Sequence, residues 1–188
     1  AVLLSERVRT SSTLTSLDMS KTGMVAEGAS AIAAAASVSG SLAECNVRGN
    51  NLNAESATLL AKVGTERSIT LFGIKHGQTE ANFTNQGLGA IDAILISSDL
   101  MVSKVLKKLS LGDCKIKDEG AIAIGESLKT NKTLEVLELV NCGIGAAGGK
   151  AVGKALQLGI AVLTSLNLYY NDIGVEGGKA IAEVLPKW

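Results

Sequence analysis

An eleven-residue pattern returns along this chain at a nearly constant step. It has the form LxxLxLxx(N/C)xI, where x is any residue, and it is clearest at residues 134–144 and 163–173. Its first position falls at Leu14, Leu42, Gln78, Leu106, Leu134 and Leu163. The steps between these positions are 28, 36, 28, 28 and 29 residues. A period in this range indicates a solenoid, in which each unit packs on its neighbours, rather than a fold with one central core.

Two periodicities divide each unit into a strand and a helix. Alternate residues of the first half are apolar, as at Leu137 and Leu139, which predicts a short strand with one side in the core. Small and apolar residues then recur at helical spacing, as at Gly120, Ala121 and Ile124. A helix connects each strand to the next, so successive strands must be parallel.

The register predicts the limits of the repeat region. Residues 1–13 fit the end of a preceding, truncated repeat, and residues 14–188 fit a repeat domain with units beginning near residues 14, 42, 78, 106, 134 and 163. The one long step leaves an insertion near residues 65–77. Solenoids need polar units at their ends. We find none at the N-terminus, so we expect the ends to pack on other repeats or chains.

These residues resemble the ribonuclease-inhibitor-like subfamily of leucine-rich repeat proteins. The step of 28–29 residues, the long helical half and the NxIGxxG turn at residues 171–177 carry the resemblance, which covers nearly the whole chain apart from the insertion. It implies an α/β right-handed solenoid of about six repeats, bent into a horseshoe, with a parallel sheet on the concave face and helices on the convex face. It also implies protein recognition, mainly by the concave face and its loops.

The ninth position of the pattern is usually Asn or Cys in that subfamily. Here it holds Thr22, Asn50, Gln86, Cys114, Cys142 and Asn171. We expect a polar side chain at this position to bond backbone groups where the strand bends into the turn. The remaining cysteine, Cys45, occupies a core position of a strand. The three cysteines have no CxxC spacing, so we expect buried free thiols and no zinc or redox site.

Composition excludes several classes of partner. The chain has 18 Lys+Arg and 18 Asp+Glu residues, so it lacks the basic stripe expected of a nucleic-acid-binding protein. No apolar run reaches the roughly 18–20 residues that a membrane-spanning helix needs. Unpaired cysteines favour a reducing compartment. We therefore expect an intracellular, cytoplasmic protein, with an organelle as the alternative.

The motifs that suggest catalysis have a simpler explanation. Residues 143–148 match the dinucleotide-binding pattern GxGxxG, but the same positions in neighbouring units are ordinary repeat turns. The only histidine, His76, lies in the insertion, whereas the candidate nucleophiles Cys114 and Cys142 lie in structural positions. We therefore predict no enzyme activity, no catalytic residue, no cofactor and no metal.

The outward strand positions form the first candidate recognition surface. Tyrosine and arginine are enriched among the residues that dominate the energy of protein interfaces. We therefore predict that a protein partner binds a set of residues near the C-terminal strands, with one arginine in addition: Tyr169, Tyr170, Val140, Glu138, Asn167 and Arg48. The alternative is that the two tyrosines only cover the end of the sheet.

The insertion is the second candidate. Its apolar residues alternate, which favours a short strand or hairpin, and we predict contacts to a partner through Leu71, Phe72, Ile74 and His76. The alternative is that the insertion only fills a gap beside the irregular third unit.

The most favoured function is a non-enzymatic protein–protein interaction module that binds through the concave face and adjoining loops. A second possibility is a regulator of an enzyme, such as a GTPase activator or inhibitor. That function needs an acidic or Asn-rich patch, which only Glu44, Glu80 and Glu138 begin to supply. A third is an architectural subunit or segment of a larger assembly.

Overall fold

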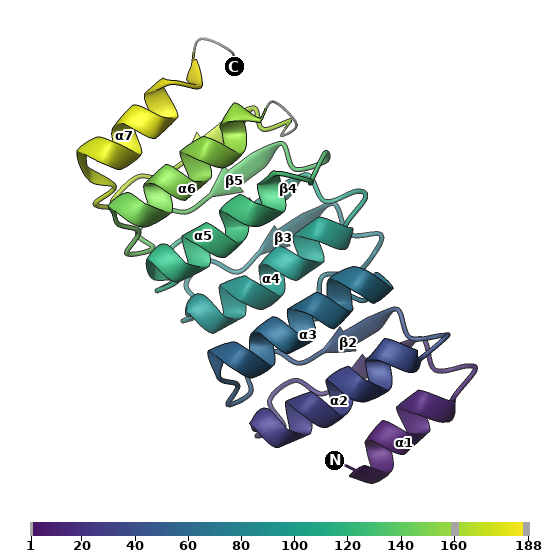
Figure 1. Ribbon diagram of the computed structural model, residues 1–188. Helices are drawn as coiled ribbons and strands as arrows, with labels where there is room; N and C mark the ends of the chain where they lie inside the picture. The colour runs from purple at the N-terminus through teal and green to yellow at the C-terminus, as the bar shows by residue number, and fades with distance from the viewer. Residues whose placement is uncertain (1, 159–161, 186–188) are drawn as a thin grey trace. The chain divides into compact units, whose positions relative to one another are not determined.

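The computed structural model describes residues 2–158 and 162–185, so the predictions for Ala1 and for residues 159–161 and 186–188 lie outside it. In the described ranges seven helices alternate with six strands (Figure 1). The helices are α1 (Val2–Thr10), α2 (Ala26–Val38), α3 (Ala54–Arg67), α4 (Ala90–Val102), α5 (Lys117–Leu128), α6 (Ala146–Gln157) and α7 (Gly174–Ala182). The strands are β1 (Ser16–Asp18), β2 (Glu44–Asn46), β3 (Glu80–Asn82), β4 (Lys108–Ser110), β5 (Val136–Glu138) and β6 (Ser165–Asn167). The predicted α/β repeat of about six units is confirmed.

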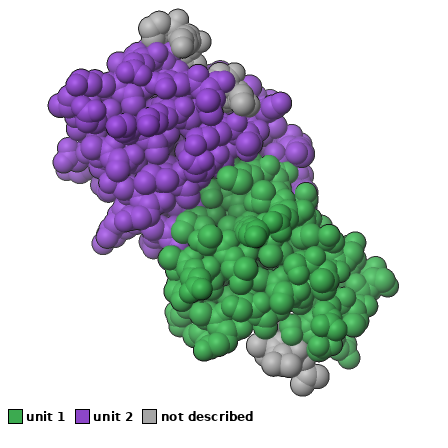
Figure 2. Space-filling model, viewed as in Figure 1, with its two compact units in different colours: residues 1–75, 94–102 green, residues 76–93, 103–188 purple. Residues whose placement is uncertain are grey.

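The chain forms two compact units, coloured separately in Figure 2. Unit 1 comprises residues 1–75 and 94–102, and unit 2 comprises residues 76–93 and 103–188. The strands divide in the same way. β1 and β2 pair in parallel in unit 1, and β3, β4, β5 and β6 pair in parallel in that order in unit 2. The sequence predicts one six-stranded sheet, whereas the structure has a two-stranded sheet in unit 1 and a four-stranded sheet in unit 2.

The register of the strands places the repeated leucines in line. In unit 2, Leu109 lies opposite Leu137, which lies opposite Leu166. Leu109 and Leu137 are fully buried, and Leu166, on the last strand, is half-buried. Each fully buried leucine side chain stabilises the fold by about 2 kcal/mol relative to an exposed one. The stripe of leucines is therefore the core of the repeat.

Small residues allow neighbouring helices to approach closely. In unit 2, α5 packs on α6 and α6 packs on α7. A β-carbon added at Gly148 would lie 2.8 Å from the β-carbon of Ala121, and one added at Gly153 would lie 2.7 Å from the carbonyl carbon of Ala180. The helices could not pack this tightly with larger side chains at these two positions.

The segment that follows α3 explains where the sheet of unit 1 ends. Ser68 adopts a left-handed conformation and terminates the helix. Thr70 then pairs in parallel with Glu44 of β2, and the carbonyl of Leu71 accepts a hydrogen bond from Val47 at 2.9 Å. This segment therefore occupies the edge of β2 as a single bridge, and it forms no hairpin.

The helices are short. Within the described residues, none is long and apolar enough to cross a membrane.

Candidate protein-binding surface

A polar side chain holds the turn that follows each strand. The Oδ1 atom of Asn171 accepts hydrogen bonds from the backbone N–H groups of Cys142 and Ile144, both at 3.0 Å. Its Nδ2 atom donates to the carbonyls of Leu139, at 2.6 Å, and Leu168, at 3.0 Å. The predicted role of the ninth position is confirmed, because this one side chain links the turns of two repeats.

The cysteines act in the same way. The thiol of Cys142 donates to the carbonyl of Leu111 at 3.1 Å, and the thiol of Cys114 donates to that of Phe83 at 3.4 Å. All three cysteines are free and buried, as predicted. Burial raises the pKa of Cys142 to about 11 and that of Cys45 to about 12. These two thiols therefore stay protonated at neutral pH and are poor nucleophiles.

The same position in every turn has a left-handed backbone. In unit 2 these residues are Asn85 (φ 57°), Asp113 (φ 56°), Asn141 (φ 51°) and Tyr170 (φ 61°); we call them the left-handed row. Backbone hydrogen bonds of 2.8–2.9 Å fix their register, because each of the first three donates to the turn of the next repeat. The side chain of Asn141 also donates to Asp113 at 2.8 Å. The backbone of the row is therefore held in register, and one pair of its side chains is linked by a hydrogen bond.

Tyr169 and Tyr170 project from the last of these turns. The two residues are 70% and 73% exposed, and the ring centroids lie 5.8 Å apart with the planes tilted by 51°. The Oδ1 atom of Asn167 accepts a hydrogen bond from the backbone N–H of Tyr169 at 3.0 Å. This bond holds the backbone of the turn that carries both rings, and both residues remain largely exposed to solvent.

Glu138 lies one repeat away on β5. Its carboxylate accepts hydrogen bonds from Ser110 at 2.5 Å and from the ammonium of Lys108 at 3.0 Å. The bond from Ser110, followed by the bond from Lys108, lowers the pKa of Glu138 below its ordinary value. Val140, next to Glu138 on the outward side, is half-buried. Five of the six predicted residues therefore lie in unit 2 on consecutive repeats.

Arg48 is the exception. It belongs to unit 1, where its guanidinium lies over the ring of Phe72, 5.3 Å from the centroid. This cation–π contact occupies the arginine within its own unit.

The apolar residues of the insertion are inside unit 1. Leu71, Phe72 and Ile74 are 1–2% exposed, so their side chains contribute to the core and not to the surface. His76, the first residue of unit 2 in this segment, is exposed. The predicted contact through the three apolar side chains conflicts with this burial, because they are needed to close the core beside β2.

Asp99 on α4 is a buried polar residue that the repeat pattern did not predict. This carboxylate is fully buried and accepts hydrogen bonds from the backbone N–H groups of Leu71, at 2.5 Å, and Phe72, at 2.9 Å. Burial raises its pKa to about 7, and bonds from the N–H groups of Leu71, Phe72 and Ile74 act in the opposite direction. A lone acidic residue within the apolar stretch 93–102 was the available signal.

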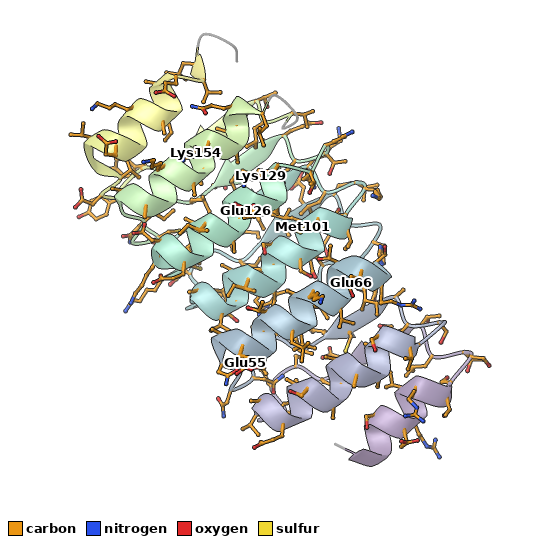
Figure 3. The ribbon with its side chains drawn as sticks, in the orientation of Figure 1. Glu55, Glu66, Met101, Glu126, Lys129 and Lys154 are labelled. Atoms are coloured by element: carbon orange, nitrogen blue, oxygen red, sulfur yellow. The ribbon has the colours of Figure 1, made fainter. Side chains whose placement is uncertain are left out.

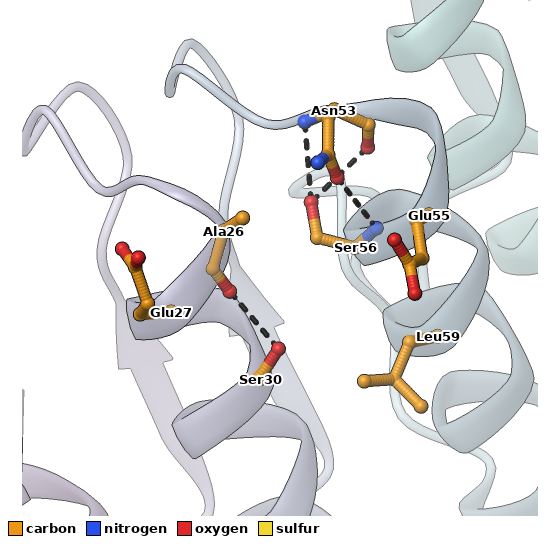
Figure 4. Close-up of a pocket in the computed structure, with 7 residues that line it drawn as sticks. All are labelled: Ala26, Glu27, Ser30, Asn53, Glu55, Ser56 and Leu59. Atoms are coloured by element: carbon orange, nitrogen blue, oxygen red, sulfur yellow. Dashed lines mark hydrogen bonds between the residues drawn. The ribbon is translucent and has the colours of Figure 1, made fainter.

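The helical side carries ordinary surface chemistry. Glu126 and Lys129 form an ion pair of 2.5 Å at the C-terminal end of α5 (Figure 3). A hollow of about 190 Å³ lies between the first turns of α2 and α3 (Figure 4). There Asn53 caps α3 by accepting a hydrogen bond from the N–H of Ser56 at 2.8 Å. The described residues contain no group of three or more His, Cys, Asp or Glu residues that could hold a metal ion.

Comparisons with known proteins agree with this architecture. The family model described as a leucine-rich repeat matches residues 10–33, 102–125, 130–153 and 161–182, which together are half of the chain. Among solved structures, the chain is similar to the actin-binding site 2 of leiomodin-1, with a TM-score of 0.50 and 27% sequence identity. That match covers 57% of this chain and 63% of the leiomodin-1 chain. A comparison with curated proteins found no match.

The matched segments coincide with the repeats whose strands, turns and helices are described above. This chain belongs to the leucine-rich repeat family.

Proposed function

We propose that this chain is a non-enzymatic recognition module that binds a protein partner through the strand face of unit 2. We define this face as the outward side chains of four segments that contain β3, β4, β5 and β6. Each segment begins at the first position of a repeat and ends at its residue in the left-handed row: residues 78–85, 106–113, 134–141 and 163–170. The observation that carries the proposal is the exposed pair Tyr169 and Tyr170, whose rings contact each other. Each tyrosine offers a large contact area with only two rotatable side-chain bonds, so ordering the pair on binding costs little entropy.

We also propose that this chain belongs to the ribonuclease-inhibitor-like subfamily of leucine-rich repeat proteins. The regular step of 28–29 residues and the Asn or Cys side chains that link neighbouring turns support it. The alternative function as an enzyme regulator has less support. Of its three acidic residues, Glu138 is neutralised by Lys108 and Glu44 belongs to unit 1.

Actin is the candidate partner that one observation favours. The similar solved structure is an actin-binding site of leiomodin-1, and the similarity includes sequence as well as fold. The two chains share 27% of their residues over about three fifths of each, so the partner is a proposal for this chain.

The experiment measures binding of actin monomers to three proteins by fluorescence anisotropy. They are the wild type, the double variant Tyr169→Ala/Tyr170→Ala, and the matched double variant Glu126→Ala/Lys129→Ala. The last pair forms an exposed ion pair on α5 and contributes little to stability.

We expect the wild type and the α5 variant to bind alike, and the tyrosine variant to bind at least tenfold more weakly. A second readout covers partners other than actin. A photo-crosslinker at the exposed Ser165 of β6 should label a protein in cell extract with wild type and the α5 variant, but not with the tyrosine variant. Equal labelling by all three proteins would show that the tyrosine pair is not part of the binding surface.

A further inference from the structure

Tyr170 occupies a backbone conformation that does not suit it. The equivalent positions of the other repeats hold Lys21, Gly49, Asn85, Asp113 and Asn141, all with positive φ. Glycine lacks a β-carbon, and Asn and Asp adopt this conformation more readily than bulky residues do. Tyr170 has the same left-handed φ of 61° and a 73% exposed ring, so little burial offsets the strain. Strain of this kind is typical of residues retained for binding.

The surrounding face is acidic. It carries the four carboxylates of Glu80, Asp113, Glu135 and Glu138 against the two ammonium groups of Lys107 and Lys108, a net charge of −2. Lys107 pairs with Glu135 at 2.8 Å and Lys108 with Glu138 at 3.0 Å. Within the described residues, Glu80 and Asp113 form no ion pair. Two further lysines lie beyond the face: Lys115 on the loop before α5, and Lys117 as the first residue of that helix.

We propose that the partner is a basic, extended segment whose arginine or lysine side chain stacks on Tyr169 and Tyr170, and whose second basic residue reaches Asp113. The inference rests on the proposed function and names the chemistry of its partner. A cation binds favourably over an aromatic face within about 6 Å of the ring centre. Both tyrosines are at least 70% exposed, so a cation in solution can reach their rings.

The register of the repeats sets the spacing of the two basic residues. Tyr170 and Asp113 belong to turns that are two repeats apart, and neighbouring strands lie about 4.8 Å apart, so the two positions are separated by about 10 Å. A segment in the extended polyproline II conformation advances about 3.1 Å per residue and returns to the same face at every third residue. The basic residues therefore lie three positions apart, as in Arg-x-x-Lys.

The test is a selection from a displayed library of random ten-residue peptides on the purified chain, with counter-selection on Tyr170→Asn. This variant removes the ring and relieves the backbone strain, so its thermal midpoint should not fall below that of wild type. A loss of binding by the variant would then not be due to unfolding. Tyr170→Phe keeps the ring face and serves as the matched control.

We expect the selected peptides to contain two basic residues three positions apart. Replacing the first arginine by citrulline, which has a similar shape and no charge, should weaken binding about three- to fivefold. Asp113→Asn should weaken only those peptides that carry the second basic residue. Binding should also weaken at higher salt, because the charged groups are exposed.

Selected peptides without arginine or lysine, or no selected peptide at all, would overturn the inference. The proposed function would stand in that case if the tyrosine double variant still lost actin or the crosslinked protein. If the tyrosine variant also kept those partners, both proposals would be wrong.

Discussion

The Oδ1 atom of Asp99 accepts a hydrogen bond from the backbone N–H of Leu71 at 2.5 Å, and its Oδ2 atom accepts one from Phe72 at 2.9 Å. Both donors belong to the segment that closes the sheet of unit 1 after Thr70. A single buried side chain on α4 thus satisfies N–H groups that a longer strand would have paired with a neighbour.

Replacement of Asp99 by alanine should lower the free energy of unfolding by roughly 2–4 kcal/mol, because two buried N–H groups lose their acceptor. Urea denaturation measures the loss, and hydrogen exchange of the Leu71 and Phe72 amides should show where it occurs. Asp172→Ala is the control, since Asp172 is exposed and its replacement should change stability by about 0.5 kcal/mol or less. Equal stability of both variants would contradict the role assigned to Asp99.

The pKa of Asp99 predicts how stability depends on pH. Burial raises this pKa from an ordinary value of 3.8 to about 7. Between these values the folded protein binds a proton that the unfolded chain has released. The contribution of Asp99 to stability is therefore full below about pH 4 and is lost as the pH rises through about 7.

Urea midpoints of wild type and Asp99→Asn between pH 4.5 and 8 provide the measurement. The wild type should lose stability relative to the variant as the pH rises. Glu138 behaves in the opposite way, because its lowered pKa means that its contribution is lost as the pH falls below its ordinary value of 4.5. Measurements above pH 4.5 keep the two effects apart. Parallel curves for wild type and variant would refute the assignment.

Asn171→Ala should destabilise unit 2 by about 1–3 kcal/mol. The change removes one acceptor shared by Cys142 and Ile144 and one donor to Leu139 and Leu168. Asn171→Cys should cost less, since cysteine holds the same position in the two preceding repeats. Thermal unfolding of both variants, with the exposed neighbour Asp172→Ala as the control, decides whether the linked turns contribute as stated.

An exchange of residues within the left-handed row should reveal the strain at Tyr170. Tyr170→Asn is expected to raise the free energy of unfolding by about 1 kcal/mol, and Asn85→Tyr to lower it by a similar amount, because both positions have φ near 60°. Urea denaturation of the two single variants and of the double variant measures this. If Tyr170→Asn were instead destabilising, the ring would contribute more to the fold than its exposure indicates.

Two glycines of unit 2 should respond to alanine in opposite directions. At Gly153 the new β-carbon would lie 2.7 Å from the carbonyl carbon of Ala180, so Gly153→Ala should cost about 1–3 kcal/mol. At Gly178, inside α7, no atom lies within 4 Å, so alanine should stabilise the helix by about 0.5–1 kcal/mol. Thermal midpoints that moved in the same direction would show that α6 and α7 pack differently.

The repeat period predicted most of unit 2 correctly. Leu109, Leu137 and Leu166 are aligned across neighbouring strands, and Asn171 and Cys142 hold the turns. Both features follow from residues that recur at the same offset in each unit, because stacked copies of one local structure bring equal offsets together. The same alternation also predicted that Tyr169 would face outward.

In unit 1 the repeat period did not predict every strand pairing or every buried residue. The sequence by itself determined the strand–turn–helix repeat, its parallel register and the identity of the core leucines. Only the tertiary structure decided that Thr70 rather than β3 pairs with β2, that Leu71 and Phe72 are buried, and that Asp99 supplies their hydrogen bonds. The physical reason is that these contacts join residues about 26–28 positions apart that have no counterpart in the other repeats. A periodic pattern specifies contacts that recur, whereas the partners of an irregular segment depend on which buried N–H groups remain unpaired after the chain has packed.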